Sequence, residues 1–333
     1  MYKLNIILKQ HTPLIHFQHD QEGATLRASE VKPKLDKFIL TKLGEGDYQK
    51  GFEIAQKNGW IINNGKNDCK ALDYKMKIKC SNPVEINLPI KEVRKRGVVQ
   101  RDELGSILFT TESYPDNMNS LIMGNMGGRI KEDVLNFVLY SDIKMILISK
   151  KNTLIDEIKN FVFTFFVENG FGNRTSKGFG SYTVDKIDNN KCEEKHLGDW
   201  ALSFSINAES DEEISIDKAY RDIFVAINKM WKGLKRYGKS NKDGLKSVFL
   251  GRKSILKGNE DRIPSPLIFK PIIKNQQDDE WRIQILALLN ENVIDRAGAD
   301  MNDFYELIDK AVQEANLNSQ YKNNYSISNI KLR

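Results

Sequence analysis

The chain has 333 residues, of which 40% are apolar and 29% are charged, and its formal net charge is +6. This length favours two domains over one compact core, and the composition excludes the disordered and fibrous classes of protein. No stretch approaches the ~18 consecutive apolar residues of a membrane-spanning helix, so we expect no membrane partner.

The N-terminal part of the chain predicts strands followed by one helix. Residues 3–9 alternate enough for a strand, and residues 14–18 predict a second, shorter one. Ser29 is a typical N-cap and favours a helix of about 30–43. Residues 44–70 are rich in glycine and asparagine and predict a loop.

The middle of the chain predicts a sheet and a helix that covers it. Residues 71–80 alternate with period two, and residues 134–149 supply further strand material. Between them, residues 82–130 mix short strand-like runs with Gly, Asn and Pro and predict an irregular insertion. Residues 154–168 carry the broad apolar stripe of a helix packed on a sheet, and residues 181–187 predict the next strand.

A polar, unpatterned segment at 188–197 predicts the domain boundary. Beyond it the chain predicts a strand, a helix, two strands, a helix and a frayed tail, at residues 200–207, 216–236, 265–273, 281–289, 301–316 and after 318. Each half therefore has the order of a split β-α-β unit. We predict an α+β protein of two tandem ferredoxin-like (RRM-like) domains, at 1–190 and 198–333.

One loop is unlike the rest of the chain. Residues 169–181 read NGFGNRTSKGFGS and follow the predicted helix 154–168. Because fixing glycine costs conformational entropy, four glycines here indicate backbone positions that other residues fill poorly. The loop lacks the Gly-Lys-Ser/Thr ending of a P-loop, and it leads from a helix into a strand, the reverse of a dinucleotide fingerprint. We therefore expect no cofactor.

The residues of this glycine-rich loop are suited to holding a phosphodiester backbone. Gly172, Gly178 and Gly180 permit positive φ and close approach of another backbone, where successive N–H groups form an anion-binding nest. Arg174 offers a fork for phosphate oxygens, and Lys177 offers a point charge. These features predict recognition without hydrolytic machinery.

Three further residues of the loop have structural interpretations. Gly170 has the position of the glycine that commonly follows a helix. Phe171 and Phe179 either stack on bases or anchor the loop to the sheet, and we expect the anchoring role.

Three segments, in order along the chain, carry a family resemblance. The glycine-rich loop resembles the signature of the RAMP superfamily of CRISPR-associated RNA-binding proteins. Residues 11–32, HTPLIHFQHDQEGATLRASEVK, are similar to the opening of the first subunit of the type III-B (Cmr) effector complex. Residues 262–272, RIPSPLIFKPI, resemble that family's late Arg-x-x-Ser-Pro-Leu strand. The chain departs from the family at Pro33 and Asp36, where glycine and arginine are usual.

The resemblance implies a non-catalytic, cytoplasmic subunit that holds the 3′ portion of the guide RNA, target RNA or both during antiviral RNA interference. Guide RNA, target RNA and other Cmr-type subunits are the implied partners. The loop and the two similar segments together give the predicted RNA-binding residues, Arg27, Lys32, Gly170, Gly172, Arg174, Lys177, Gly178, Gly180 and Arg262. Three scattered cysteines without a Cys-x-x-Cys pair also favour a reducing cytoplasm and no structural metal.

Two basic clusters also point toward a polyanion. Residues 229–257 hold ten Lys and Arg but only one acidic residue, Asp243. Residues 91–101 hold five Lys and Arg, offset by Glu92. Each cluster is interpreted either as a solvated face or as part of a nucleic-acid surface.

Other functions stay open. A metal-independent endoribonuclease that processes CRISPR repeats would use histidine as general acid or base, and His11, His16 and His19 lie close together, with His196 in the predicted linker. We expect surface or RNA-contacting roles for the clustered three, with catalysis and metal binding as alternatives. Nearly half of the chain follows the glycine-rich loop, whereas repeat-processing enzymes carry it near the C-terminus, so we expect no enzyme activity. A protein–protein scaffold using helix 301–316 is a third interpretation.

Overall fold

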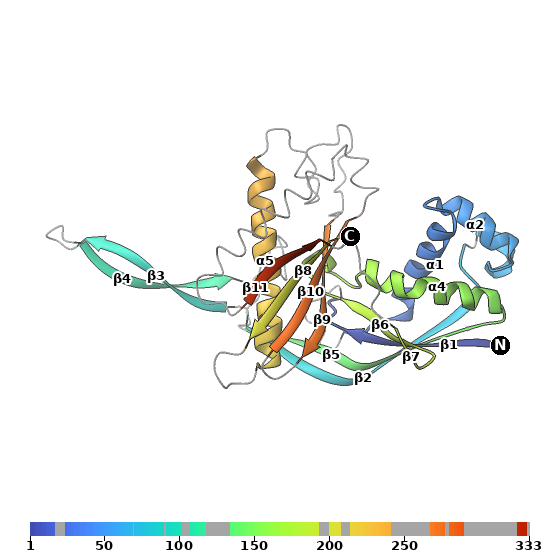
Figure 1. The fold of residues 1–333 in the computed structure, drawn as a ribbon, viewed down its shortest axis with the longest axis horizontal. Helices are drawn as coiled ribbons and strands as arrows, with labels where there is room; N and C mark the ends of the chain where they lie inside the picture. Colours follow the sequence, from blue (N-terminus) through green and yellow to red (C-terminus); the bar gives the residue numbers. More distant parts are fainter. Residues whose placement is uncertain are drawn as a thin grey trace.

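Two antiparallel sheets and a separate two-stranded ribbon contain the strands in the described part of the chain (Figure 1). The computed structural model describes residues 1–16, 24–68, 70–89, 91–101, 107–117, 134–192, 200–207, 214–240, 267–276, 280–289 and 325–331. Helices accompany both sheets, so the predicted α+β class is confirmed.

The first sheet has the strand order β2-β5-β1-β6-β7. Its strands are β1 (Tyr2–Gln10), β2 (Tyr74–Pro89), β5 (Val134–Ser149), β6 (Tyr182–Ile187) and β7 (Asn190–Lys191). β1 lies in the middle and pairs antiparallel with both β5 and β6. The strands predicted in this half are therefore present, with one exception. The strand predicted at 14–18 is not found, because the described residues 11–16 have no regular secondary structure.

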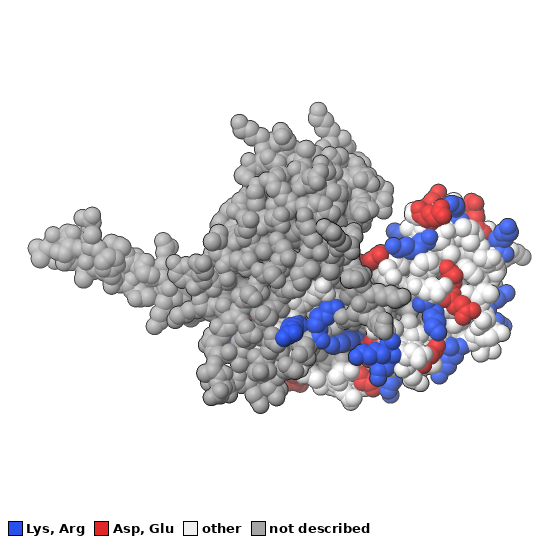
Figure 2. All heavy atoms as spheres, in the orientation of Figure 1, with Lys and Arg blue, Asp and Glu red and all other residues white. Residues whose placement is uncertain are grey.

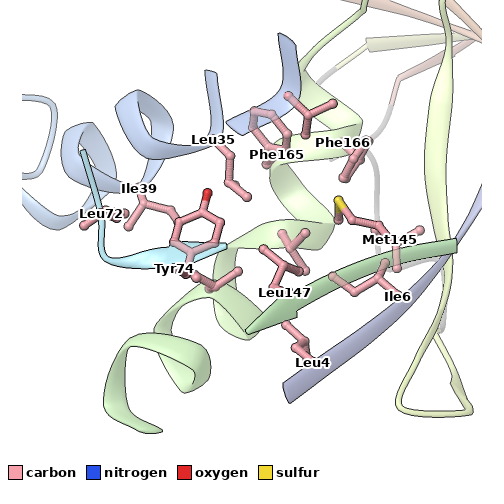
Figure 3. Close-up of a cluster of buried hydrophobic side chains, with 14 of the residues drawn as sticks. Leu4, Ile6, Leu35, Ile39, Leu72, Tyr74, Met145, Leu147, Phe165 and Phe166 are labelled. Carbon is pink, nitrogen blue, oxygen red and sulfur yellow. The ribbon is translucent and has the colours of Figure 1, made fainter. Parts of the chain in front are cut away.

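Helices α1 (Ala28–Leu43) and α4 (Asn152–Glu168) pack on one face of this sheet. Figure 3 shows Leu35 and Ile39 of α1 in one cluster with Phe165 and Phe166 of α4 and with side chains of β1, β2 and β5. Burial of each large apolar side chain contributes about 1.5–3 kcal/mol, so this layer supplies much of the stability of the first half. The strand members that Figure 3 labels are Leu4, Ile6, Tyr74, Met145 and Leu147.

Two predictions about the first helices are wrong. Ser29 lies inside α1, and Arg27 occupies the N-cap without a side-chain hydrogen bond. The predicted loop 44–70 contains helix α2 (Tyr48–Lys57) and the 3₁₀ helix η1 (Ile62–Asp68).

Local contacts explain why α2 forms in a segment that looks like a loop. The Oδ1 of Asp47, its N-cap, accepts hydrogen bonds from the backbone amides of Gln49 and Lys50. Gly51 allows the backbones of α2 and α1 to come close, because a Cβ on Gly51 would collide with the carbonyl oxygen of Leu40 in α1. The glycine therefore serves helix packing rather than a turn.

The predicted irregular insertion 82–130 is largely regular where it is described. β2 continues to Pro89, and strands β3 (Lys91–Arg101) and β4 (Ile107–Asn117) pair antiparallel along their whole length. The β3–β4 ribbon extends away from the two sheets (Figure 1). The valines of β3 and the isoleucine, threonine and aromatic residues of β4 favour this extended form over a loop. The basic cluster at residues 91–101 therefore lies on β3.

The second sheet has the order β11-β8-β10-β9, and helix α5 (Ile216–Ser240) follows β8 in the chain. Its strands are β8 (Trp200–Asn207), β9 (Leu267–Gln276), β10 (Glu280–Leu289) and β11 (Tyr325–Lys331). The prediction of a frayed tail is wrong, because β11 pairs with β8 from Tyr325 to Lys331. Its sequence, YSISNIK, alternates only from Tyr325 to Ser328 and places Ile330 out of phase, so it gave a weak strand signal.

Some predictions fall outside the described residues. Among them are the helix 301–316, half of the predicted boundary 188–197 and the second part of the basic segment 229–257. The domain limits 1–190 and 198–333 stay a prediction. In the described part, Cys80 and Cys192 are free thiols, and no helix has the length and apolar character needed to cross a membrane.

Candidate nucleic-acid interface

The three segments that resemble the RAMP family meet at one place, between the two sheets. The Oγ1 of Thr12 donates a hydrogen bond to the carbonyl oxygen of Gly178 at 2.7 Å and accepts one from the amide of Ser181 at 3.0 Å. The Oγ of Ser181 in turn donates to the carbonyl oxygen of Pro271 in β9 at 2.6 Å. The glycine-rich loop is therefore held by the residues after β1 on one side and by β9 on the other.

The end of helix α4 fixes where the loop begins. Asn169, its C-cap, is extended, and its Nδ2 donates to the carbonyl oxygen of Phe165 at 2.9 Å. Gly170 does not have a positive φ, so its predicted role as the glycine that follows a helix is wrong. The lack of a side chain at Gly170 instead makes room for Thr175, because a Cβ there would lie 2.9 Å from the Thr175 Cβ and Cγ2.

Lys270, on β9 of the second sheet, caps the same C-terminal end of α4. Its ammonium donates to the carbonyl oxygen of Asn169 at 2.6 Å and to that of Phe166. A cation at this position interacts favourably with the negative end of the helix dipole. The side chain is only 2% exposed, and this burial lowers the pKa of Lys270 to about 7. No sequence pattern indicated this interaction, because Lys270 occupies an ordinary strand position.

The predicted positive φ angles are confirmed at three glycines, and the predicted close backbone approach is confirmed at two of them. The φ angles of Gly172, Gly178 and Gly180 are 71°, 89° and 66°. A Cβ on Gly172 would collide with the carbonyl oxygen of Ile15, and one on Gly180 would collide with that of Phe171. The loop therefore needs glycine at both positions on two independent grounds.

The amides of these glycines are occupied within the protein. Gly172 donates to Glu30 Oε1 at 2.6 Å, and Gly180 donates to the carbonyl oxygen of Pro13 at 2.8 Å. Gly178 donates to the carbonyl oxygen of Thr175 at 3.1 Å. The predicted anion-binding nest is therefore absent at these three positions. The glycines shape the loop, and its side chains are the groups that could recognise a ligand.

Both phenylalanines of the loop are anchors, as expected. Phe171 is 0% exposed and packs edge-on against Phe165 and Tyr182 in the first core. Phe179 is 1% exposed and stacks on Phe224 of α5, with 4.2 Å between ring centroids. Because both rings are buried, the alternative of stacking on RNA bases is excluded for them.

Arg174 and Lys177 are half-buried and lie at the two ends of a single 3₁₀ turn, η2 (Thr175–Lys177), with Arg174 as its N-cap and Lys177 as its last residue. Arg174 has a left-handed backbone with φ 61°. The Nζ of Lys177 lies 4.1 Å from the centre of the Trp231 ring, and the Nε1 of Trp231 donates to the carbonyl oxygen of Ser176 at 2.7 Å. Helix α5 therefore fixes the turn that carries the two cations.

The remaining predicted RNA-binding residues differ in placement. Arg27 is exposed at the N-cap of α1. The ammonium of Lys32 donates to Asp36 Oδ2 at 2.7 Å and to the carbonyl oxygen of Leu72 at 3.0 Å. Lys32 is therefore bound internally, which argues against its predicted RNA contact. Asp36 stands where the family usually has arginine, and burial raises its pKa while Lys32 lowers it. Arg262 lies outside the described residues.

Lys34 was not predicted but lies at the start of the loop. Its ammonium donates to Glu30 Oε1 at 3.2 Å and to the carbonyl oxygen of Gly170 at 3.4 Å, and it lies 5.1 Å from the Phe171 ring centre. The same Glu30 oxygen accepts the amide of Gly172, so α1 and the loop form one unit. The Glu-to-Lys spacing of four was the only sequence signal for this residue.

The histidines are placed differently from the prediction. His11 is buried, and its Nδ1 accepts the backbone N–H of Ile273 at 3.0 Å, so its Nε2 donates to Thr183 Oγ1 at 2.7 Å. Burial first, then nearby lysines, lower the pKa of His11 well below its usual value. His11 therefore has neither the predicted surface position nor a nitrogen left for a substrate or metal.

The other histidines give no catalytic arrangement in the described part of the chain. His16 Nε2 lies 3.1 Å from the carbonyl oxygen of Thr25, while His19 and His196 lie outside the described residues. In the ranges that the structure describes, no three or more His, Cys, Asp or Glu side chains come together as metal ligands would.

Comparison with known proteins gives a protein family and similar solved structures. The model of the Cmr1 N-terminal domain matches residues 1–236. A chain of a type III-B Cmr-beta complex bound to cognate target RNA is 13% identical with a TM-score of 0.33, over 57% of this chain and 60% of that one. The chain thus spans less than two thirds of that structure's chain. No curated protein matches the sequence significantly.

Two further solved structures are similar over longer stretches. Cmr1 from Pyrococcus furiosus, in its apo form, is 10% identical with a TM-score of 0.38, covering 87% of this chain and 89% of that one. A structure described as a RAMP protein binding different RNA substrates is 11% identical with a TM-score of 0.20, covering 89% and 91%.

Proposed function

The chain belongs to the Cmr1 family of RAMP proteins, and on this premise we propose that it is a non-catalytic RNA-binding subunit of a type III-B CRISPR effector. Its proposed ligands are guide RNA, through its 3′ portion, and target RNA. Its proposed partners are the other subunits of the effector. The proposal goes beyond family membership in naming the ligand, the site and the absence of catalysis.

The observation that carries the proposal is that the other two similar segments, residues 11–32 and 262–272, converge on the glycine-rich loop. Thr12, Glu30 and Pro271 each bond the loop from a different element. This support fixes the turn that carries Arg174 and Lys177. Cations on a rigid turn bind phosphate oxygens without losing further conformational freedom, which is the usual means of positioning a nucleic-acid backbone.

The fold-level part of the proposal is the tandem ferredoxin-like organisation. In each sheet the first long strand lies between the third and the fourth, as β1 lies between β5 and β6, and β8 between β10 and β11. Helix α1 connects the first two long strands of the first sheet, and α5 those of the second. These shared features support two copies of one β-α-β-β-α-β unit.

The non-catalytic part of the proposal rests on how the chain uses its histidines. General acid–base catalysis requires a group within reach of substrate, with a pKa near the working pH. His11 has both ring nitrogens bonded inside the protein, and its pKa is displaced downward. The loop itself offers cations and no base.

Purification from the native host tests the proposal. The tagged full-length chain, isolated under mild salt, is expected to carry small CRISPR-derived RNA and the other effector subunits, as read by RNA sequencing and mass spectrometry. In EDTA, the pure protein is expected to leave CRISPR repeat RNA intact. Isolation without RNA, or discrete repeat cleavage that His16→Ala abolishes, would overturn it.

A further inference from the structure

The open face of the first sheet is rich in lysine. Helices α1 and α4 cover one face, and the side chains that alternate with the buried core residues point to the other. Eight exposed lysines lie on this face and on the short strand β7 beside it. Lys9 donates to the carbonyl oxygen of Ile273 in β9. The other seven define the lysine face: Lys3, Lys75, Lys77, Lys79, Lys144, Lys186 and Lys191.

Strand pairing brings these lysines into rows. Lys79 lies opposite Lys144, which lies opposite Ile7, and Ile7 lies opposite Lys186, which lies opposite Lys191. One row of four lysines therefore crosses the sheet from β2 to β7. With strands ~4.8 Å apart, the row spans about 19 Å. Along β2, every second residue from Lys75 to Lys79 is a lysine, and neighbouring lysines are about 7 Å apart.

This arrangement is unfavourable for the isolated protein. Two cross-strand pairs, Lys79 with Lys144 and Lys186 with Lys191, set like charges directly opposite each other. Like charges directly opposite each other destabilise a sheet. The acidic groups beside the face are few: Asp142 pairs with Lys144 at 3.2 Å, and Asp188 accepts the amide of Asn5 at 3.0 Å. A bound polyanion would remove the repulsion.

Figure 2 shows the distribution of charge on one side of the molecule. Lys and Arg side chains gather along the lower part of the described surface, where the strands of the first sheet run in Figure 1. Asp and Glu are more prominent toward the helices at the upper right.

The side chains between the lysines indicate what is recognised. In the described part of this face they are Asn5, Ile7, Ile146 and Ile148, none of which is aromatic. Sheet surfaces that read RNA bases do so by stacking them on aromatic rings. A face of lysines without such rings binds phosphates, so binding would be independent of base sequence and sensitive to salt.

We propose that the lysine face binds the sugar-phosphate backbone of single-stranded RNA, as a surface separate from the glycine-rich loop. The proposal rests on the proposed function and assigns a second contact to it. A row of point charges across the sheet, interrupted only at Ile7 on β1, fits a linear chain of phosphates better than the scattered carboxylates of an acidic protein. The face lies on β1 and its neighbours, whereas the loop is held by Thr12 and Pro13, beyond the end of that strand.

A binding measurement on the full-length protein tests this proposal. The probe is a labelled oligouridylate of about 20 nucleotides, and its binding is monitored by fluorescence anisotropy at several KCl concentrations. For Lys75→Gln with Lys77→Gln and Lys79→Gln, we expect affinity at ~0.1 M salt to fall about tenfold or more. Because three phosphates are then no longer neutralised, the log–log salt slope should flatten by about 2. The matched control is Lys37→Gln with Lys50→Gln and Lys57→Gln, which removes the same charge from exposed positions on α1 and α2.

A second variant, Lys3→Gln with Lys144→Gln and Lys186→Gln, draws on three other strands and should weaken binding similarly. Unchanged affinity and slope in both face variants, an equal loss in the control, or tighter binding of polyglutamate than of oligouridylate would overturn the proposal. If only Arg174→Gln with Lys177→Gln weakens binding, the lysine face is excluded and the proposed function stands. If the unmodified protein binds no RNA, both fail.

Discussion

The buried imidazole of His11 accepts a hydrogen bond from the backbone N–H of Ile273, a residue 262 positions further along the chain, at 3.0 Å. This bond joins the end of β1 to β9 and so connects the two sheets. Ser181, at the end of the glycine-rich loop, reaches the same strand at Pro271. The loop is therefore positioned by the contact between the two sheets rather than by either one alone.

The first prediction concerns pH and His11. Burial lowers the pKa of His11 well below its ordinary value of 6.5, so the folded protein keeps it neutral while the unfolded chain takes up a proton below about that pH. Stability should therefore fall as pH drops below 6.5, by up to about 1.4 kcal/mol per pH unit from this group. Urea unfolding at pH ~7.5 and pH ~5 measures it.

The matched variant for this measurement is His11→Asn, which keeps an acceptor near Ile273 but does not titrate. It should lose less stability than the unmodified protein on going to the lower pH. An equal loss in both proteins would show that His11 does not contribute to the acid sensitivity.

The second prediction concerns Lys270. Its pKa is lowered from 10.5 to about 7 by burial, so between these values the unfolded chain binds a proton that the folded protein does not. Stability should therefore rise with pH above about 7, and the rise should be absent in Lys270→Met. The Met variant should also be less stable at pH ~9, by about 1–3 kcal/mol, because the carbonyl oxygens of Phe166 and Asn169 lose their donor. Parallel pH profiles for the two proteins would refute this account.

The third prediction separates two costs of replacing glycine. Gly180 has φ 66°, and a Cβ there would collide with the Phe171 carbonyl oxygen, whereas Gly46 has φ 100° and open space around it. Gly46→Ala should cost about 1–2 kcal/mol for the backbone alone. Gly180→Ala should cost clearly more, as measured by urea unfolding. Equal losses would mean that the close approach in the loop is not needed.

Sequence patterns predicted the regular elements well where one face is buried. β5 and β8 have the predicted bounds, and α4 begins within two residues of the predicted start. These elements alternate or repeat clearly, because a half-buried strand or helix must place apolar residues on one side. α2 was missed because its glycine was interpreted as a loop signal, and β11 because its strand pattern is polar.

The glycine-rich loop shows the limit of such reasoning. The sequence identified the glycines that need positive φ, because few other residues adopt that conformation. It did not show which carbonyl or carboxylate oxygen accepts the hydrogen bond of each glycine amide. The acceptors belong to Glu30, Pro13 and Thr175, which lie at different sequence separations from the glycines. The anion-binding nest was inferred from local geometry, but acceptors far away in the sequence occupy two of the three glycine amides, those of Gly172 and Gly180.

Direct measurement of RNA binding by the loop is the most decisive test of the account. Arg174→Gln with Lys177→Gln should weaken binding of guide RNA to the full-length protein and flatten the log–log salt slope by about 0.7 for each phosphate that is no longer bound. The control variant Lys50→Gln with Lys57→Gln, on α2, should bind as the unmodified protein does. Unchanged affinity and salt slope in the loop variant, with thermal stability preserved, would contradict the assignment of the glycine-rich loop as an RNA-binding site.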